Sequence, residues 1–160
     1  ACGILRDTGI LRCFCDNPST LSVCSAPPDD ASKAWSSVSA QPTGTSVCGI
    51  LRDTQELRCW GDSYWGEIDI PAGDRLAAWS HVHLSTQKGC GILADSKLLR
   101  CWGWPSSRAT IPADLVDAQW LHIHTGGGSI CGVLLTGLVL LRVTQLFTDR
   151  VHFLRDCALF

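Results

Sequence analysis

The sequence predicts an all-β fold, a β-propeller-like array of about four antiparallel blades whose hairpins carry disulfides. A segment that begins with Cys-Gly occurs four times, starting at Cys2, Cys48, Cys90 and Cys131. The copies are about forty residues apart, which is the usual spacing of propeller blades. Short apolar segments alternate with turn residues throughout, and no stretch has the periodicity of a long helix.

The clearest unit covers residues 48–61. Two short apolar runs flank the polar residues 53–56, which is the pattern of a β-hairpin. The midpoint between Cys48 and Cys59 falls within this turn, so the two cysteines are expected to face each other at a non-hydrogen-bonded position. Side chains approach most closely there, which suits a disulfide.

The remaining cysteines extend this pattern. Two other hairpin pairs repeat the same interval: Cys2 with Cys13, and Cys90 with Cys101. Cys15 and Cys24 lie in one loop and are available to each other, and Cys131 is left with Cys157, but spacing proves neither pairing. Zinc sites normally contain C-x-x-C, which is missing, and ten cysteines indicate an oxidising compartment. We therefore predict a secreted, extracellular protein.

The length and composition of the chain limit the kinds of function that it can have. We expect residues 1–160 to form one β-repeat domain, with a partial unit at 151–160, in a mature chain whose leader has been removed. The net charge of −2 argues against nucleic-acid binding. The longest apolar run, residues 130–141, is too short to span a bilayer, so no membrane span is predicted.

A second recurring element is a tryptophan that opens a short alternating segment. This pattern predicts a strand beginning at Trp35, Trp79 and Trp120. A glycine-containing turn then leads to the next Cys-Gly segment, so each unit is expected to hold about four strands.

With these motifs in place, the chain resembles repeats of the regulator-of-chromosome-condensation superfamily, in their extracellular, cysteine-bearing form. The matching segments are Cys-Gly-Ile-Leu at 48–51, Cys-Trp-Gly at 59–61, Gly-Glu-Ile at 66–68, Pro71, and Cys-Ala-Leu at 157–159. The match is good over 35–131, partial over 1–34 and weak over 132–156. The resemblance implies blades of four antiparallel strands, and it implies no particular activity, because such folds host many functions.

Aromatic residues near the hairpin exits are candidate ligand contacts. Trp60 and Trp102 are expected in the packing between blades, whereas Trp65, Trp104 and the adjacent Tyr64 fall in predicted loops. Exposed aromatic rings stack on sugars or fill a partner's pocket. We predict contact with a glycan or protein ligand at these three residues.

Histidines at alternate positions raise the question of a metal site. His81 with His83, and His122 with His124, occupy equivalent places in neighbouring units, and alternate residues share one face of a strand. No carboxylate supports a metal there, so we predict no metal and no cofactor. No acid/base pair or nucleophile motif is present, and the sequence therefore indicates a protein without enzyme activity.

The leading hypothesis is an extracellular, non-enzymatic β-repeat protein that acts through protein–protein contacts. The incomplete terminal units leave strand edges unpaired, which favours self-assembly into a homo-oligomer, either a ring or a structural filament. The alternative is a ligand- or glycan-binding propeller module, lectin-like or part of a receptor ectodomain. A secreted metal enzyme that uses the paired histidines is the third possibility.

Overall fold

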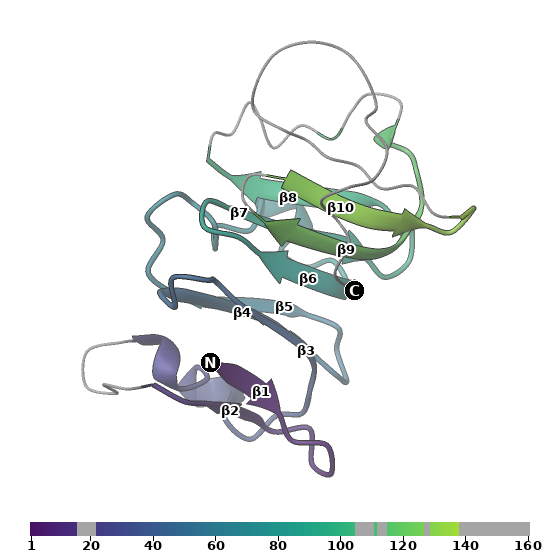
Figure 1. Ribbon diagram of the computed structural model, residues 1–160. Helices are drawn as coiled ribbons and strands as arrows, with labels where there is room; N and C mark the ends of the chain where they lie inside the picture. Colours follow the sequence, from purple (N-terminus) through teal and green to yellow (C-terminus); the bar gives the residue numbers. More distant parts are fainter. Residues whose placement is uncertain (16–21, 105–110, 112–114, 127–128, 138–160) are drawn as a thin grey trace.

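The computed structural model describes residues 1–15, 22–104, 111, 115–126 and 129–137, and within them the fold is all-β, as predicted. The strands form four antiparallel sheets (Figure 1). The first two sheets contain β1 (Cys2–Ile4) and β2 (Leu11–Cys13), then β3 (Trp35–Ala40), β4 (Ser46–Leu51) and β5 (Leu57–Gly61). The next two contain β6 (Trp79–Leu84), β7 (Lys88–Leu93) and β8 (Leu99–Gly103), then β9 (Trp120–Gly126) and β10 (Ser129–Leu134).

Three short 3-10 helices complete the described elements. They are η1 (Ser22–Cys24), η2 (Pro28–Asp30) and η3 (Ala72–Asp74). Within the described ranges, therefore, no helix has the length and apolar character needed to cross a membrane.

The four sheets pack in chain order, each against the next. Figure 1 places β1–β2 and β9–β10 at opposite ends of the stack. The first strands of successive sheets lie beside one another, since β3 contacts β6 and β6 contacts β9. This is the arrangement of successive propeller blades, and the described sheets form an open stack and not a closed four-bladed ring.

The two central sheets contain three strands each, whereas the sequence predicted about four per unit. The segment after β5 forms turns that lead into η3 instead of a further strand. Its N–H groups bind locally, because Asp69 donates to the carbonyl of Gly66 and Ile70 donates to that of Ile68. Pro71 has no N–H to donate. This segment therefore has few groups left for a strand ladder.

Disulfides close the three predicted hairpins. Cys48 and Cys59 are direct cross-strand partners, with Cα atoms 4.1 Å apart. This short separation is that of a non-hydrogen-bonded pair, as the spacing predicts. Equivalent bridges join Cys2 to Cys13 and Cys90 to Cys101.

The other cysteines are placed as follows. Cys15 and Cys24 are joined by a disulfide, with Cα atoms 5.8 Å apart. Cys131 on β10 is also disulfide-bonded. Cys157, the partner that the sequence leaves for it, lies outside the described residues, and so does the partial unit predicted at 151–160.

A buried tryptophan begins the first strand of three sheets. Trp79 is 0% exposed, and its backbone N–H donates to the carbonyl of Gln55 in the preceding hairpin turn at 2.8 Å. Gln55 has a φ of 58°, which turns this carbonyl towards the next sheet. The same bond joins Trp35 to Gly9 and Trp120 to Lys97. Each hairpin turn thus fixes the start of the following blade.

The glycine after each repeated cysteine makes room for this tryptophan. A Cβ at Gly91 would lie 2.6 Å from ring atoms of Trp79, which is closer than real contacts allow. Gly49 and Gly132 stand in the same relation to Trp35 and Trp120. Gly3 has no atom within 4 Å of its Cβ position, because the first described sheet lacks the tryptophan-bearing strand.

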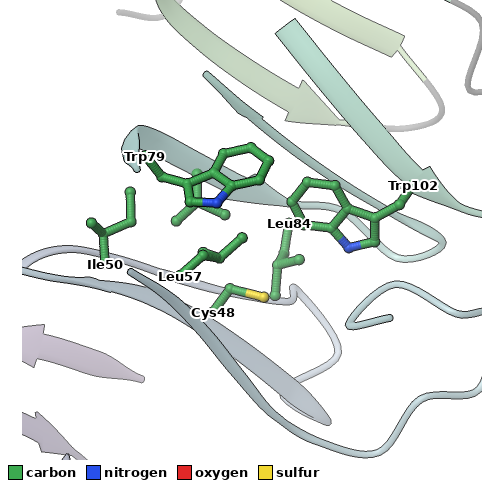
Figure 2. Packing of buried hydrophobic residues seen from close by; sticks show 7 residues of the cluster. Cys48, Ile50, Leu57, Trp79, Leu84 and Trp102 are labelled. Atoms are coloured by element: carbon green, nitrogen blue, oxygen red, sulfur yellow. The ribbon is translucent and has the colours of Figure 1, made fainter. Parts of the chain in front are cut away.

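The apolar core lies between successive sheets. Figure 2 shows Trp79 and Trp102 of the third sheet packed towards Ile50 and Leu57 of the second. Trp102 is 5% exposed and Trp60 is 9% exposed, so both lie in the packing between blades as predicted. This packing fixes the loops at the hairpin exits, from which the candidate site is built.

Candidate functional site

Three predicted contact residues form one aromatic cluster at the surface, in which Tyr64 and Trp104 are exposed and Trp65 is partly buried. Tyr64 and Trp65 follow β5, and Trp104 follows β8, so the cluster joins loops from two successive sheets. The ring centroids of Tyr64 and Trp65 are 4.8 Å apart, and those of Trp65 and Trp104 are 5.2 Å apart. Tyr64 is 79% exposed and Trp104 is 50% exposed. We call these three residues the aromatic cluster.

The backbone holds this cluster to the folded framework. The N–H of Trp65 donates to Oε2 of Glu67 at 2.7 Å, and the N–H of Trp104 donates to the carbonyl of Gln87 at 2.9 Å. The indole N–H of Trp102, in the core, donates to the carbonyl of Glu67 at 2.8 Å. Glu67 therefore links the exposed rings to the packing between blades.

A buried polar network surrounds the carboxylate of Glu67. Glu67 is 0% exposed, and its Oε1 lies 3.5 Å from Nε2 of Gln41. Gln41 also donates from Nε2 to the carbonyl of Thr86 at 2.6 Å and accepts from the hydroxyls of Ser46 and Thr45. Buried polar groups that are satisfied in this way fix one arrangement of the loops. The aromatic cluster is consequently preorganised.

The rings of the cluster are tilted against each other and do not form a flat platform. The planes of Tyr64 and Trp65 meet at 74°, and those of Trp65 and Trp104 meet at 44°. Such a surface presents ring faces and edges in several directions. It can enclose an apolar or cationic side chain of a partner, and an exposed ring face can also stack on a sugar.

The four histidines lie in two rows across β6 and β9. Nδ1 of His122 is 2.9 Å from Nε2 of His81, so one ring donates to the other. The rings of His83 and His124 are 3.9 Å apart. Among the described residues no group of three or more His, Cys, Asp or Glu side chains has the arrangement to hold a metal ion. His83 also contacts Thr125, whose hydroxyl oxygen lies 2.8 Å from Nδ1 of His83.

Burial changes the proton affinity of two of these histidines. Desolvation, and then the neighbouring His124, lowers the pKa of His83 from 6.5 to about 4. Desolvation also lowers the pKa of His81, followed by the effects of His122 and Lys97. Both imidazoles therefore stay neutral in the folded chain to a lower pH than a free histidine does.

Sequence reasoning did not identify Glu67 or Gln41 as supporting residues. Glu67 occupies the middle of the Gly-Glu-Ile segment used for the family resemblance, and an acidic residue next to apolar Ile68 was a signal for a buried carboxylate. Gln41 gave no comparable signal, because its distant partners, Thr86 and Glu67, lie in loops of two other segments. Its position depends on tertiary packing.

The comparisons with known proteins agree with this architecture. The entire ectodomain of the Physcomitrella patens receptor kinase CR4 is 28% identical, with a TM-score of 0.61, over 84% of this chain and 33% of that one. The CRINKLY WD40 ectodomain of the Arabidopsis thaliana receptor kinase ACR4 is 25% identical, with a TM-score of 0.63, over 84% of this chain and 43% of that one. No protein-family model matches the chain, and no curated protein is a significant match.

These results define the class of protein. The chain has the propeller-repeat fold of receptor ectodomains, and it spans about a third to two fifths of the two structures it resembles. The four described disulfides and the likeness to ectodomains are consistent with an extracellular location. The aromatic cluster remains a predicted contact site.

Proposed function

We propose that this chain is an extracellular, non-enzymatic interaction module that binds a protein ligand through the aromatic cluster. The observation that carries the proposal is the exposure of touching, preorganised rings: Tyr64 is 79% and Trp104 is 50% exposed. Large aromatic side chains held rigidly at a surface are the residues that most often dominate binding energy. Because the loops are fixed by the Glu67 network, little conformational entropy is lost on binding.

The similar structures support this class of function by analogy. Both are ectodomains of receptor kinases, and an ectodomain is the part of a receptor that meets extracellular partners. Fold alone does not define a ligand, so the proposal rests on the cluster and uses the likeness only for its setting. We also propose that the repeats belong to the regulator-of-chromosome-condensation type, on the motifs around Cys59 and Trp60.

A glycan is the second candidate ligand. The half-exposed ring of Trp104 favours it, because one open indole face can stack on a sugar. The tilt between the rings favours a protein side chain over an extended sugar surface. Self-assembly into a ring or filament, which the sequence led us to expect, is a separate proposal.

The test uses labelled chain on intact cells of the source tissue, with unlabelled chain as competitor. Trp65→Ala and Trp104→Ala are each expected to weaken saturable binding at least tenfold. Phe14→Ala is the matched control, because Phe14 is an aromatic residue that is 73% exposed and outside the cluster. Equal binding by the wild type and both tryptophan variants would overturn the proposal.

Pretreatment of the cells separates the candidate ligands. Protease treatment is expected to abolish binding of the wild-type chain, while glycosidase treatment is expected to leave it. The opposite pattern would favour the glycan. Light scattering on the same preparations tests self-assembly, since a particle near the chain mass of 17.3 kDa would exclude a ring or filament.

A further inference from the structure

Two neighbouring joints between blades use the same backbone hydrogen bond with different acceptors. Where β3 meets β6, the N–H of Leu84 donates to Oγ of Ser39 at 2.9 Å. Where β6 meets β9, the N–H of Thr125 donates to Nδ1 of His83 at 3.2 Å. Ser39 and His83 occupy equivalent positions, each on the first strand of its sheet. The chain thus contains two versions of one joint.

The two acceptors respond differently to acid. A backbone N–H can only donate, so Nδ1 of His83 must be the unprotonated nitrogen of the ring. The hydroxyl of Thr125 lies 2.8 Å from the same nitrogen. A proton added to a neutral His83 goes to Nδ1 and removes this acceptor. The hydroxyl oxygen of Ser39 keeps its lone pairs at every pH in this range.

His81, in the second histidine row at the same joint, also resists a proton. His81 and His122 share one hydrogen bond, and Nδ1 of His81 is buried without a hydrogen-bond partner. A proton added to His81 either leaves an N–H on this buried nitrogen or breaks the pair between the rings. Both outcomes weaken the contact of β6 with β9, because a buried unpaired donor is costly.

No acidic residue on the packed strands compensates for a positive charge. The sequences of β3, β4, β6, β7, β9 and β10 contain no Asp or Glu. The titratable groups that act on His81 and His83 are His122 and His124 on β9 and Lys97 in the turn after β7. Protonation would therefore place positive charges beside other cationic groups.

We propose that acid opens the joint between β6 and β9, while the joint between β3 and β6 stays closed. The trigger is protonation of His83 at Nδ1, which releases the N–H of Thr125, and the His81–His122 pair adds to the effect. The aromatic cluster lies between the second and third sheets and is unaffected. The proposed opening in acid is thus confined to one end of the described stack of sheets.

The direction follows from the proton affinities of the closed and open states. In the closed joint the pKa of His83 is about 4, and in an open joint it returns towards 6.5. Above pH 6.5 neither state binds the proton, so the full stability of the joint is present. As the pH falls from 6.5 towards 4, only the open state gains the proton, and the stability is lost progressively.

The test is amide hydrogen exchange by NMR on the whole chain, comparing Thr125 with Leu84. The ratio of the Thr125 to the Leu84 protection factor is expected to fall about tenfold or more between pH 6.5 and about pH 4.5. This ratio cancels the intrinsic pH dependence of exchange. A ratio that stays constant across this range would overturn the proposal.

The variant His83→Ser gives the β6–β9 joint the serine hydroxyl acceptor that Ser39 supplies at the β3–β6 joint. It is expected to keep Thr125 protected at neutral pH and to remove the pH dependence of the ratio. If this variant fails to fold, the titration of His83 in the wild-type chain decides by imidazole chemical shifts. A neutral ring with its proton on Nε2 and a pKa well below 6.5 supports the proposal. A proton on Nδ1 or an ordinary pKa contradicts it.

Discussion

The molecule contains two sets of tryptophans with opposite roles. Trp35, Trp79 and Trp120 begin the first strands, are 0% exposed and each cover a glycine of the next strand. Trp65 and Trp104 lie on loops after the last strands and contact each other at the surface. The buried tryptophans occur at the same position of each repeat unit, at the start of its first strand. The surface tryptophans have no such equivalent position. The difference indicates which tryptophans maintain the fold and which remain available for a partner.

The largest expected effect comes from removing a tryptophan of the buried set. Trp79→Ala deletes a ring at the centre of the packing between the second and third sheets, and we expect a loss of about 3–5 kcal/mol in the free energy of unfolding. Chemical denaturation with the disulfides intact measures this loss. Trp104→Ala, at a half-exposed surface position, is expected to change stability by about 1 kcal/mol or less. Equal losses for both variants would erase the distinction.

A smaller effect is expected from the glycine beneath the buried ring. Gly91→Ala places a Cβ against Trp79, and we expect a destabilisation of about 1–3 kcal/mol by overpacking. Gly3→Ala is the matched control, because it sits at the equivalent place of the first unit and has open space around its Cβ position. Denaturation curves of both variants test this difference. A loss at Gly3 that equals the loss at Gly91 would contradict the account.

The supports of the exposed set are expected to matter less for stability. Glu67→Gln keeps the shape of the side chain but replaces a charged acceptor of the Trp65 N–H with a neutral one. We expect a loss of about 1 kcal/mol in stability, together with a weaker hold on the aromatic cluster. The readout is quenching of tryptophan fluorescence by acrylamide, which should increase. Unchanged quenching and unchanged stability would show that Glu67 does not position the cluster.

The sequence predicted the repeated part of the molecule well because local chemistry specifies it. The position of Cys48 opposite Cys59 follows from the length of one hairpin, and the strand at Trp79 follows from alternation. In the second sheet the structure shows three strands where about four were predicted, because local hydrogen bonds of residues 66–70 replace a further ladder. The contact of Trp65 with Trp104 and the acceptor role of His83 depend on how two sheets pack. No spacing within one unit encodes that packing.

The central claim is that the surface tryptophans, together with Tyr64, form the binding surface. Oxidative footprinting of the free and the cell-bound chain tests this claim most directly. In the free chain, Tyr64 and Trp104 should react readily, while Trp35, Trp79 and Trp120 should not. On binding, we expect strong protection of Tyr64 and Trp104, with the control residue Phe14 still reactive. Continued oxidation of Trp104 in the bound chain, with protection elsewhere, would contradict it.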